Sequence, residues 1–262
     1  MAPLLRGKVV VITGSSTGIG RAIALECARH GAKLVLHHIG DAQSKQDIQT
    51  LRTEIDAIQG APATVTTAEI GVDITDPEAG KRIIDIAIST FKEVNAIVHN
   101  AGIAQFEDFT AISKHQLNKH IEINFAGPFA ITQAIVQQMI TQGKGGAVVS
   151  IASITATLGS SQLVHYSATK AAILGMTVSC AVALGKHGIR FNTVSPGTIE
   201  TAINRADLAG LKRRVMEERV PLRRLGIPED IAQPVVFFIS DMAQYISGQN
   251  LIVDGGASIN YQ

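Results

Sequence analysis

Short runs of apolar residues, many of them β-branched, recur along the chain and alternate with longer segments of helical periodicity. A run without a polar face is typical of a strand covered on both sides of a parallel sheet. The runs that predict strands are residues 8–13, 33–38, 63–70, 95–99, 147–151, 189–194 and 250–253. Helices are expected at residues 21–30, 43–59, 77–91 (with Asp76 as N-cap), 113–141 and 228–240. A further helix carries Tyr166 and ends at about residue 186.

This alternation predicts βαβ units with right-handed crossovers. A chain of 262 residues is long enough for one large α/β domain, and no shift in composition suggests a linker. We therefore expect an α/β fold of the Rossmann type. Its doubly wound, parallel, seven-stranded sheet would lie between two layers of helices in a single domain. Residues 200–225 are charged and irregular, with helical stretches.

The charge balance argues against several classes of partner. The chain has 23 Lys and Arg against 22 Asp and Glu, a formal charge of +1, and no basic cluster. We expect no nucleic-acid or membrane partner, and no run reaches the roughly 18 apolar residues of a membrane span. Cys27 and Cys180 lie in apolar helical patterns without metal-ligand spacing. The expectation is a soluble, cytoplasmic protein with free thiols and no metal.

Glycines 14, 18 and 20 follow the first expected strand directly and open the first helix. Glycines in such a unit allow a tight turn and close approach of the backbone to a phosphate. The helix N-terminus adds free N–H groups and a dipole that favour an anion. The spacing G-x-x-x-G-x-G therefore predicts a site for a dinucleotide pyrophosphate, and the alternative is a turn with only a structural role.

Tyr166 and Lys170 lie four residues apart in an expected helix, so their side chains share one face. A phenol with its ordinary pKa of about 10 is a poor proton donor or acceptor at neutral pH. A neighbouring ammonium group favours the phenolate. The pair is suited to proton transfer, although a solvated helix face shows the same spacing.

Together with further motifs, these features resemble the short-chain dehydrogenase/reductase family along essentially the whole chain. The motifs, in the family's order, are the glycine turn, Asn100-Ala101-Gly102, Asn124, Ser153, Tyr166-x-x-x-Lys170, Pro196-Gly197-x-x-x-Thr201 and Asp254-Gly255-Gly256. The resemblance implies an NAD(P)-dependent oxidoreductase that moves a hydride between the nicotinamide and an alcohol, sugar hemiacetal or carbonyl. Residues 1–110 would mainly bind the dinucleotide. Residues 111–262 would supply catalysis, the substrate site and the contacts of a homotetramer, built on the Tyr166 helix and the helix at 113–141.

Carried over residue by residue, the resemblance implies a catalytic tetrad and a cofactor site. The tetrad is Asn124, Ser153, Tyr166 and Lys170. The cofactor residues are Gly14, Ser16, Thr17, Gly18, Ile19, Gly20, His38, Asp73, Ile74, Asn100, Ala101, Gly102, Tyr166, Lys170, Pro196, Gly197, Ile199 and Thr201. The glycine turn would line the pyrophosphate, Asp73 would reach the adenine, and the segment from Pro196 to Thr201 would hold the nicotinamide carboxamide.

Each member of the tetrad has a role that suits its side chain. Ser153 is a neutral donor for the reacting oxygen, and Tyr166 exchanges a proton with that oxygen as hydride moves. Lys170 favours the tyrosinate and holds the nicotinamide ribose. Asn124 would hold a water that links Lys170 to solvent. His99 precedes Asn100 where the family often has a second asparagine, and we expect it to be packed or hydrogen-bonded.

The end of the second strand bears on the choice of cofactor. NAD users commonly place a carboxylate there, which accepts from the ribose 2′-hydroxyl. This chain has His37-His38-Ile39, with no carboxylate before Asp41, and Thr17 stands where many NADP users have arginine. A 2′-phosphate is then not repelled, and His38, Thr17 or Lys45 would hold it weakly. We expect NADP or dual use, the alternative being a solvated strand end without selectivity.

Several stretches are similar to sugar 1-dehydrogenases of the L-rhamnose type, which oxidise an anomeric carbon to a lactone. They are residues 147–153, 165–166, 183–186, 196–199 and 202–208. The residues expected around the substrate are Gln105, Ser153, Thr155, Gln162, Leu163, Tyr166 and Asn204. Leu163 is apolar where a sugar favours a polar side chain, so an NADPH-dependent carbonyl (keto) reductase stays open. An inactive NAD(P)-binding sensor or scaffold would be expected to lack part of the tetrad, which is complete here.

Overall fold

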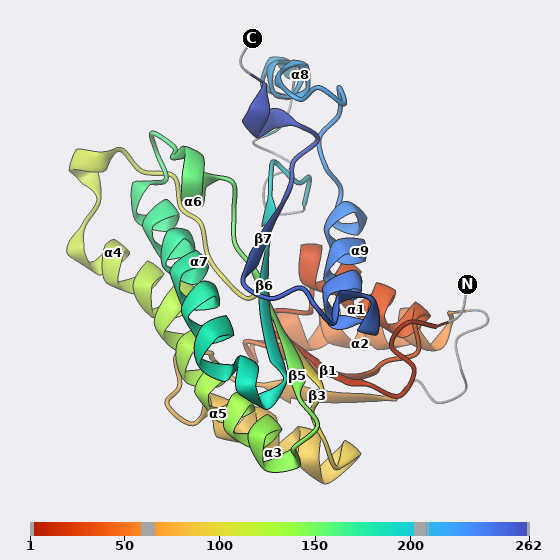
Figure 1. The fold of residues 1–262 in the computed structure, drawn as a ribbon. Helices are drawn as coiled ribbons and strands as arrows, with labels where there is room; N and C mark the ends of the chain where they lie inside the picture. Colours follow the sequence, from red (N-terminus) through yellow and green to blue (C-terminus); the bar gives the residue numbers. More distant parts are fainter. Residues whose placement is uncertain (1–2, 59–65, 202–207, 209, 261–262) are drawn as a thin grey trace.

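The computed structural model describes residues 3–58, 66–201, 208 and 210–260. Its centre is one parallel sheet with the strand order β3-β2-β1-β4-β5-β6-β7 (Figure 1). The strands are β1 (Val9–Ile12), β2 (Lys33–His38), β3 (Thr67–Gly71), β4 (Ala96–His99), β5 (Gly146–Ile151), β6 (Ile189–Pro196) and β7 (Gln249–Val253). The strand order reverses between β1 and β4. Beyond the carboxyl ends of strands at such a reversal, open α/β sheets bind their ligands.

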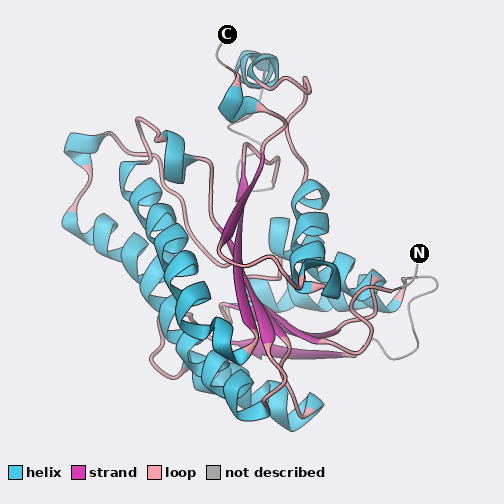
Figure 2. Cartoon of the chain, viewed as in Figure 1, coloured by secondary structure: helices cyan, strands magenta, loops and turns pink. Residues whose placement is uncertain are grey.

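Two layers of helices cover the sheet (Figure 2). The helices are α1 (Gly18–Arg29), α2 (Ala42–Asp56), α3 (Ala79–Phe91), α4 (Lys114–Ile121), α5 (Gly127–Gln142), α6 (Thr155–Leu158), α7 (Val164–Leu184), α8 (Gly210–Arg219) and α9 (Pro228–Ile239). Helices α1, α2 and α9 lie on one face, and α3, α4, α5 and α7 lie on the other (Figure 1). The expected Rossmann-type, seven-stranded, single-domain α/β fold is confirmed.

Strand β1 shows why both faces need cover. Val10 and Ile12 pack into one apolar core with α1, α2 and α9, whereas Val9 and Val11 pack into the other core with α3 and α5. Successive strand residues point to opposite faces, so a strand between two helical layers is apolar at every position. The continuous apolar runs of the sequence have this cause.

Some boundaries differ from the sequence expectation. Helix α1 begins at Gly18 rather than at residue 21. Helix α3 begins at Ala79, because Asp76 does not cap it: the Asp76 carboxylate accepts from Glu78 N at 2.9 Å and forms a local turn first. Strand β6 continues to Pro196, which pairs in register with Val253 at its carboxyl end.

The single helix expected at 113–141 is divided into three parts. Ser113 caps α4 in a capping box, accepting from Gln116 N at 3.1 Å. A π-helical segment, Glu122–Ala126, then joins α4 to α5. Such segments are rare and occur frequently at functional sites. This one carries Asn124.

Helix α7 differs from the expectation that no segment is long and apolar enough to span a membrane. The window Val164–His187 has a mean hydropathy of 1.5 and is long and apolar enough, by composition, to cross a membrane. Core helices of water-soluble proteins pass the same test, so this is weak support for a membrane segment. Only 22% of the window is buried within the chain. Val178 and Val182 are among its exposed side chains, so α7 presents an apolar surface that this single chain does not cover.

Two buried histidines lie beneath the carboxyl edge of the sheet. His37 Nδ1 accepts from Gly14 N at 3.2 Å, so its protonated Nε2 donates to Val72 O at 2.8 Å. His99 Nε2 donates to the Thr132 hydroxyl at 2.8 Å, because that hydroxyl gives its own proton to Pro128 O. Burial lowers the pKa of His37 to about 4 and that of His99 to about 3. Both imidazoles are therefore neutral in the folded protein near pH 7.

We predict that acid destabilises the protein through these histidines. In the unfolded chain both histidines become protonated below about pH 6.5. In the native state His37 becomes protonated only near pH 4 and His99 only near pH 3. The free energy of unfolding should therefore decrease as the pH is lowered. This pair contributes up to about 2.7 kcal/mol per pH unit to the decrease. Urea unfolding between pH 7 and 4.5 measures the slope. His37→Asn should reduce this slope by the contribution of one proton. His115→Gln, at an exposed position, should leave the slope unchanged. An unchanged slope in His37→Asn would contradict the assignment.

Candidate active site

The glycine turn after β1 has the geometry of an anion site. Gly14 and Gly18 have φ of +62° and +55°, a left-handed conformation that favours glycine. Helix α1 begins at once, and its N-cap Thr17 makes no side-chain capping bond. The first turn of α1 carries no acidic side chain. The leading N–H groups of the helix are therefore open to an anionic ligand.

Close packing explains the remaining glycine. A Cβ on Gly20 would collide with Gly14 O and lie 2.5 Å from Asn100 Nδ2. Asn100 Nδ2 donates to Thr13 O at 3.1 Å and to Gly14 O at 2.9 Å. A Cβ on Gly14 would lie 2.9 Å from Ala101 Cα. The turn after β1 and the segment after β4 thus fit together without space for a side chain, and this cradle fits a dinucleotide pyrophosphate.

The side chain of His38 does not point to the surface. It is 1% exposed, and its Nδ1 accepts from Gly40 N at 3.1 Å. Its Nε2 then donates to Glu69 Oε1 at 3.2 Å. Both ring nitrogens are engaged within the protein, which leaves none to face a 2′-phosphate. Asp41 caps α2 by accepting from Ser44 N at 2.7 Å, and Thr17 is exposed.

The expected adenine residues lie beyond β3. Asp73 is exposed, and its Oδ1 accepts from both N and Oγ1 of Thr75 at 2.9 Å. The neighbouring Ile74 is buried and packs into the core with α3 and α5. Asp73 is therefore held in a fixed turn with its carboxylate at the surface, and Ile74 contributes mainly through packing.

Tyr166 and Lys170 are brought together with Ser153 at the carboxyl edge. Ser153 follows β5, and its hydroxyl is hydrogen-bonded with the Tyr166 side chain. Lys170 Nζ lies 5.6 Å from the centroid of the Tyr166 ring and donates to Ile151 O at 2.8 Å. Burial raises the pKa of Tyr166, and the Ser153 hydrogen bond opposes this. Burial lowers the pKa of Lys170 to about 8.

Asn124 faces the same region from the π-helical segment. Its Oδ1 accepts from Ile103 N at 2.8 Å, and its Nδ2 donates to Ile103 O at 2.9 Å. A Cβ on Gly102 would lie 3.1 Å from Asn124 Oδ1 and 3.6 Å from Lys170 Nζ. The structure thus places all four residues of the expected tetrad around the ends of β4 and β5.

The segment after β6 closes over the glycine turn. Gly197 N donates to Val253 O at 3.0 Å, and Pro196 O accepts from Ile154 N at 3.1 Å. A Cβ on Gly18 would lie 3.5 Å from Thr201 Cγ2. Ile199 is buried and forms a bridge with Gly226. The arrangement suits a cofactor that extends from the glycine turn towards Tyr166.

Of the expected substrate residues, Thr155 begins α6, and Gln162 and Leu163 precede α7 directly. Thr155 Oγ1 donates to Ser153 Oγ at 3.1 Å, and Gln162 Nε2 donates to Asp108 Oδ1 at 3.2 Å. Leu163 is 9% exposed, whereas Asn204 lies outside the described residues.

Sequence reasoning missed Phe106, which is 61% exposed and lies 5.9 Å, ring centroid to Nζ, from Lys212 of α8. An exposed aromatic in the loop after the Asn100 motif was the available signal. The contact links α8 to the loop after β4, on the side where the substrate residues lie.

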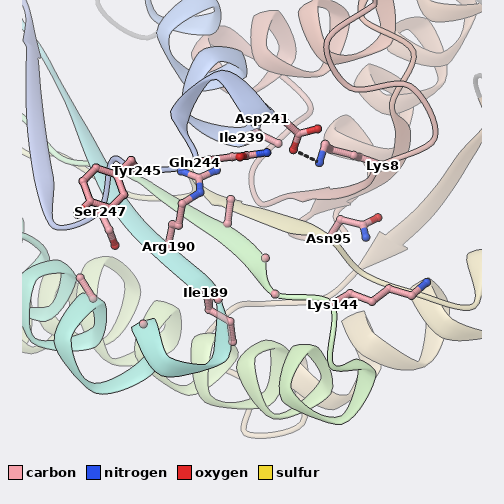
Figure 3. A pocket seen from close by; sticks show the side chains of 16 residues that line it. Lys8, Asn95, Lys144, Ile189, Arg190, Ile239, Asp241, Gln244, Tyr245 and Ser247 are labelled. Atoms are coloured by element: carbon pink, nitrogen blue, oxygen red, sulfur yellow. Dashed lines mark hydrogen bonds and ion pairs between the residues drawn. The ribbon is translucent and has the colours of Figure 1, made fainter.

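A separate hollow of about 470 Å³ lies at the opposite, amino edge of the sheet (Figure 3). Its wall includes Lys8, Asn95, Lys144 and Arg190. Lys8 is paired with Asp241 and Lys144 with Glu93, each at 2.8 Å, and the Arg190 guanidinium donates to main-chain carbonyls. The glycine turn and Tyr166 are not part of this wall, so the hollow is distinct from the candidate active site.

A glycine turn suited to a phosphate, a Ser–Tyr–Lys cluster beside it and the topology of the sheet are typical of a nucleotide-dependent oxidoreductase fold. Comparisons with known proteins agree. The family model described as enoyl-(acyl carrier protein) reductase matches residues 14–258. An L-rhamnose-1-dehydrogenase of Scheffersomyces stipitis is 46% identical over 263 residues, covering 100% of both chains. An L-rhamnose 1-dehydrogenase (NAD(P)(+)) of Azotobacter vinelandii is 44% identical, covering 99% of this chain and 100% of that one.

A solved structure supports the same conclusion. The putative gluconate dehydrogenase from Agrobacterium tumefaciens has a TM-score of 0.89 and 25% identity, covering 98% of this chain and 99% of that chain. The chain belongs to the short-chain dehydrogenase/reductase family. The protein is an oxidoreductase of that family.

We predict that Gly20→Ala weakens dinucleotide binding by at least about tenfold, because the new methyl group must displace Gly14 O or the Asn100 amide. Titration with NADP and NAD, followed by protein fluorescence or calorimetry, measures the dissociation constants. Gly175→Ala is the matched control, since its Cβ would meet nothing within 4 Å. Equal affinities for the two variants would contradict the cradle.

Proposed function

We propose that the protein is an NAD(P)-dependent aldose 1-dehydrogenase that oxidises L-rhamnose or a closely similar sugar at its anomeric carbon to a lactone. The observation that carries the proposal is the 46% identity, over the whole chain, to a protein named L-rhamnose-1-dehydrogenase. The hydrogen-bonded Ser153–Tyr166 pair beside Lys170 suits this reaction, because it provides a donor and a proton acceptor for one sugar hydroxyl.

The cofactor supplies the hydride acceptor when it is bound, and the chain's own residues handle the proton. Ser153 Oγ would hold the anomeric hydroxyl, and the ionised Tyr166 oxygen would take its proton as the C1 hydride passes to the nicotinamide. Lys170 Nζ, held by Ile151 O, stabilises the ionised phenol and binds ribose hydroxyls. Asn124 fixes the segment after β4 against this cluster through Ile103.

We infer that both NADP and NAD are used. In support, the relative from Azotobacter vinelandii is named for NAD(P)(+). Thr17 is exposed beside the glycine turn and offers a hydroxyl to a 2′-phosphate, whereas Asp41 offers a carboxylate to a 2′-hydroxyl. His38, with both ring nitrogens engaged, supports the dinucleotide site from within rather than by contact. In this proposal residues 1–110 mainly bind the dinucleotide, and residues 111–262 supply catalysis and substrate contacts.

A second candidate is an NADPH-dependent carbonyl (keto) reductase. Leu163 and Phe106 give the substrate side an apolar character that suits a less polar ketone. An inactive sensor or scaffold is disfavoured, because Asn124, Ser153, Tyr166 and Lys170 are all present and clustered.

The deciding test is a panel of aldoses, polyols and ketones assayed by NAD(P)H absorbance with both cofactors. We expect oxidation of L-rhamnose, with catalytic efficiencies for NADP and NAD within about tenfold of each other. Tyr166→Phe should lower kcat at least about a hundredfold, since the proton acceptor is lost, and leave cofactor affinity unchanged. Tyr245→Phe, at a fully exposed tyrosine, is the matched control. Turnover of ketones without any aldose would replace the first candidate by the second.

We also propose a homotetramer in which α5 and α7 form a subunit contact. Phe129, Val178 and Val182 are 41%, 53% and 83% exposed. Exposed apolar side chains on two helices of one layer are typical of an interface. The protein is inferred to act in the cytoplasm, which suits free Cys27 and Cys180.

Val182→Asp should dissociate the assembly, because an aspartate would lose its hydration in an apolar contact. Light scattering should give four times the 27.7-kDa chain mass for the wild type and a smaller mass for the variant. Thr53→Asp, which adds the same charge to the exposed side of α2, should leave the mass unchanged. A wild-type monomer would refute the proposed assembly.

A further inference from the structure

A hydrogen bond from Asn124 to Thr169 joins the π-helical segment to helix α7. Thr169 has no part in the catalytic roles given above. Asn124 Nδ2 has two hydrogens. One goes to Ile103 O at 2.9 Å, and the other goes to the Thr169 hydroxyl at 3.1 Å. Asn124 and Thr169 are 1% and 3% exposed, so water does not replace either contact. Thr169 lies next to Lys170 and three residues after Tyr166.

The direction of the Thr169 hydroxyl is fixed by the helix. Its Oγ1 donates to Tyr166 O at 2.7 Å, a bond from a helical threonine to the preceding turn. Since the proton is used there, the oxygen faces Asn124 as an acceptor. The chain of donors runs from the Asn124 amide through Thr169 to the backbone of the residue that carries the reacting phenol.

The amide is thereby held in one orientation. Ile103 N and O bind Asn124 Oδ1 and Nδ2, and Thr169 satisfies the remaining hydrogen. The same Oδ1 and Lys170 Nζ border the point that a Cβ on Gly102 would occupy, at 3.1 and 3.6 Å. Asn124 therefore presents its carbonyl oxygen, and not its amino group, towards the side of Lys170.

We propose that Thr169 is a positioning residue for catalysis, which locks the Asn124 amide onto helix α7 so that Asn124, Tyr166 and Lys170 move as one unit. Without the hydroxyl, one buried N–H of Asn124 loses its acceptor. A buried donor without a partner is costly, and the π-helical segment can relieve that cost by shifting Asn124 away from Lys170. The proton path then loses its alignment, although Thr169 contacts neither substrate nor cofactor in this assignment.

The test compares variants at two positions of α7. Thr169→Val removes the hydroxyl at nearly constant shape, and Thr169→Ser retains it. Ser167→Ala is the matched control, because the Ser167 hydroxyl is buried without a hydrogen-bond partner in the described structure. The inference rests on the proposed oxidoreductase function, so each variant is assayed with the panel substrate that the wild type turns over.

For Thr169→Val we expect kcat to fall about tenfold, the loss of one well-aligned hydrogen bond. The KM for substrate and the dissociation constant for cofactor should stay within about twofold. The solvent deuterium isotope effect on kcat should increase, because proton transfer becomes more limiting. Thr169→Ser should restore wild-type kcat, and Ser167→Ala should not alter it.

A double-mutant cycle separates positioning from general loss of structure. If Thr169 acts through Asn124, then Thr169→Val has no further effect on kcat in an Asn124→Ala background. Additive losses in the double variant, or a wild-type kcat in Thr169→Val, would overturn the proposal. If valine lowers the melting temperature, Thr169→Ala is measured in the same cycle, with the same criterion. A wild type that oxidises no aldose contradicts the proposed substrate instead, so the two failures are distinguishable.

Discussion

The hydrogen bonds from the Asn100 amide to Thr13 O and Gly14 O are the constraint on which the site depends. They join the turn after β1 to the segment after β4, at the point where the strand order reverses. Thr13 completes the junction, since its hydroxyl accepts from Asn100 N at 3.0 Å and Ala101 N at 3.1 Å. The fit is close enough that Gly20 has no space for a side chain. On the opposite side, the buried His37 ring holds Gly14 N. The anion cradle is thus preorganised from both sides.

Burial shifts the pKa values of Tyr166 and Lys170 in opposite directions. It raises the pKa of Tyr166 and lowers the pKa of Lys170, so it disfavours the charged form of each. Burial by itself therefore favours a neutral phenol. Hydrogen bonds offset this effect: Ser153 favours the tyrosinate, and Ile151 O holds the ammonium group. The tyrosinate is stabilised only where these fixed donors and acceptors are correctly aligned. The hydrogen bonds between Asn124 and Ile103 hold the neighbouring segment in place.

The two helical layers differ in how completely this chain buries their apolar side chains. Helices α1, α2 and α9 bury their apolar side chains in one core, and their layer carries the glycine turn. The other layer contains α5 and α7, whose exposed Phe129 and Val182 extend beyond the core of this chain. The helix that supplies Tyr166 and Lys170 on one side therefore supplies an apolar surface on another. The exposed apolar side chains and the Tyr166–Lys170 pair thus lie on one continuous helix.

The sequence alone predicted the strands from local periodicity and the glycine turn from its spacing. Its ordered motifs resembled those of the family to which the comparisons assign the chain. Only the tertiary structure decided the surroundings of His38, whose place at a strand end suggested a phosphate contact. Its burial follows from Ser44 and Glu69, which lie on a helix and a neighbouring strand. The π-helical segment at Asn124 was also hidden, because its apolar pattern reads as one helix. The Asn124 side chain in this segment is hydrogen-bonded to Ile103 and Thr169, which lie 21 and 45 positions away. Contacts between distant segments fix burial and hydrogen bonding, and local pattern does not record them.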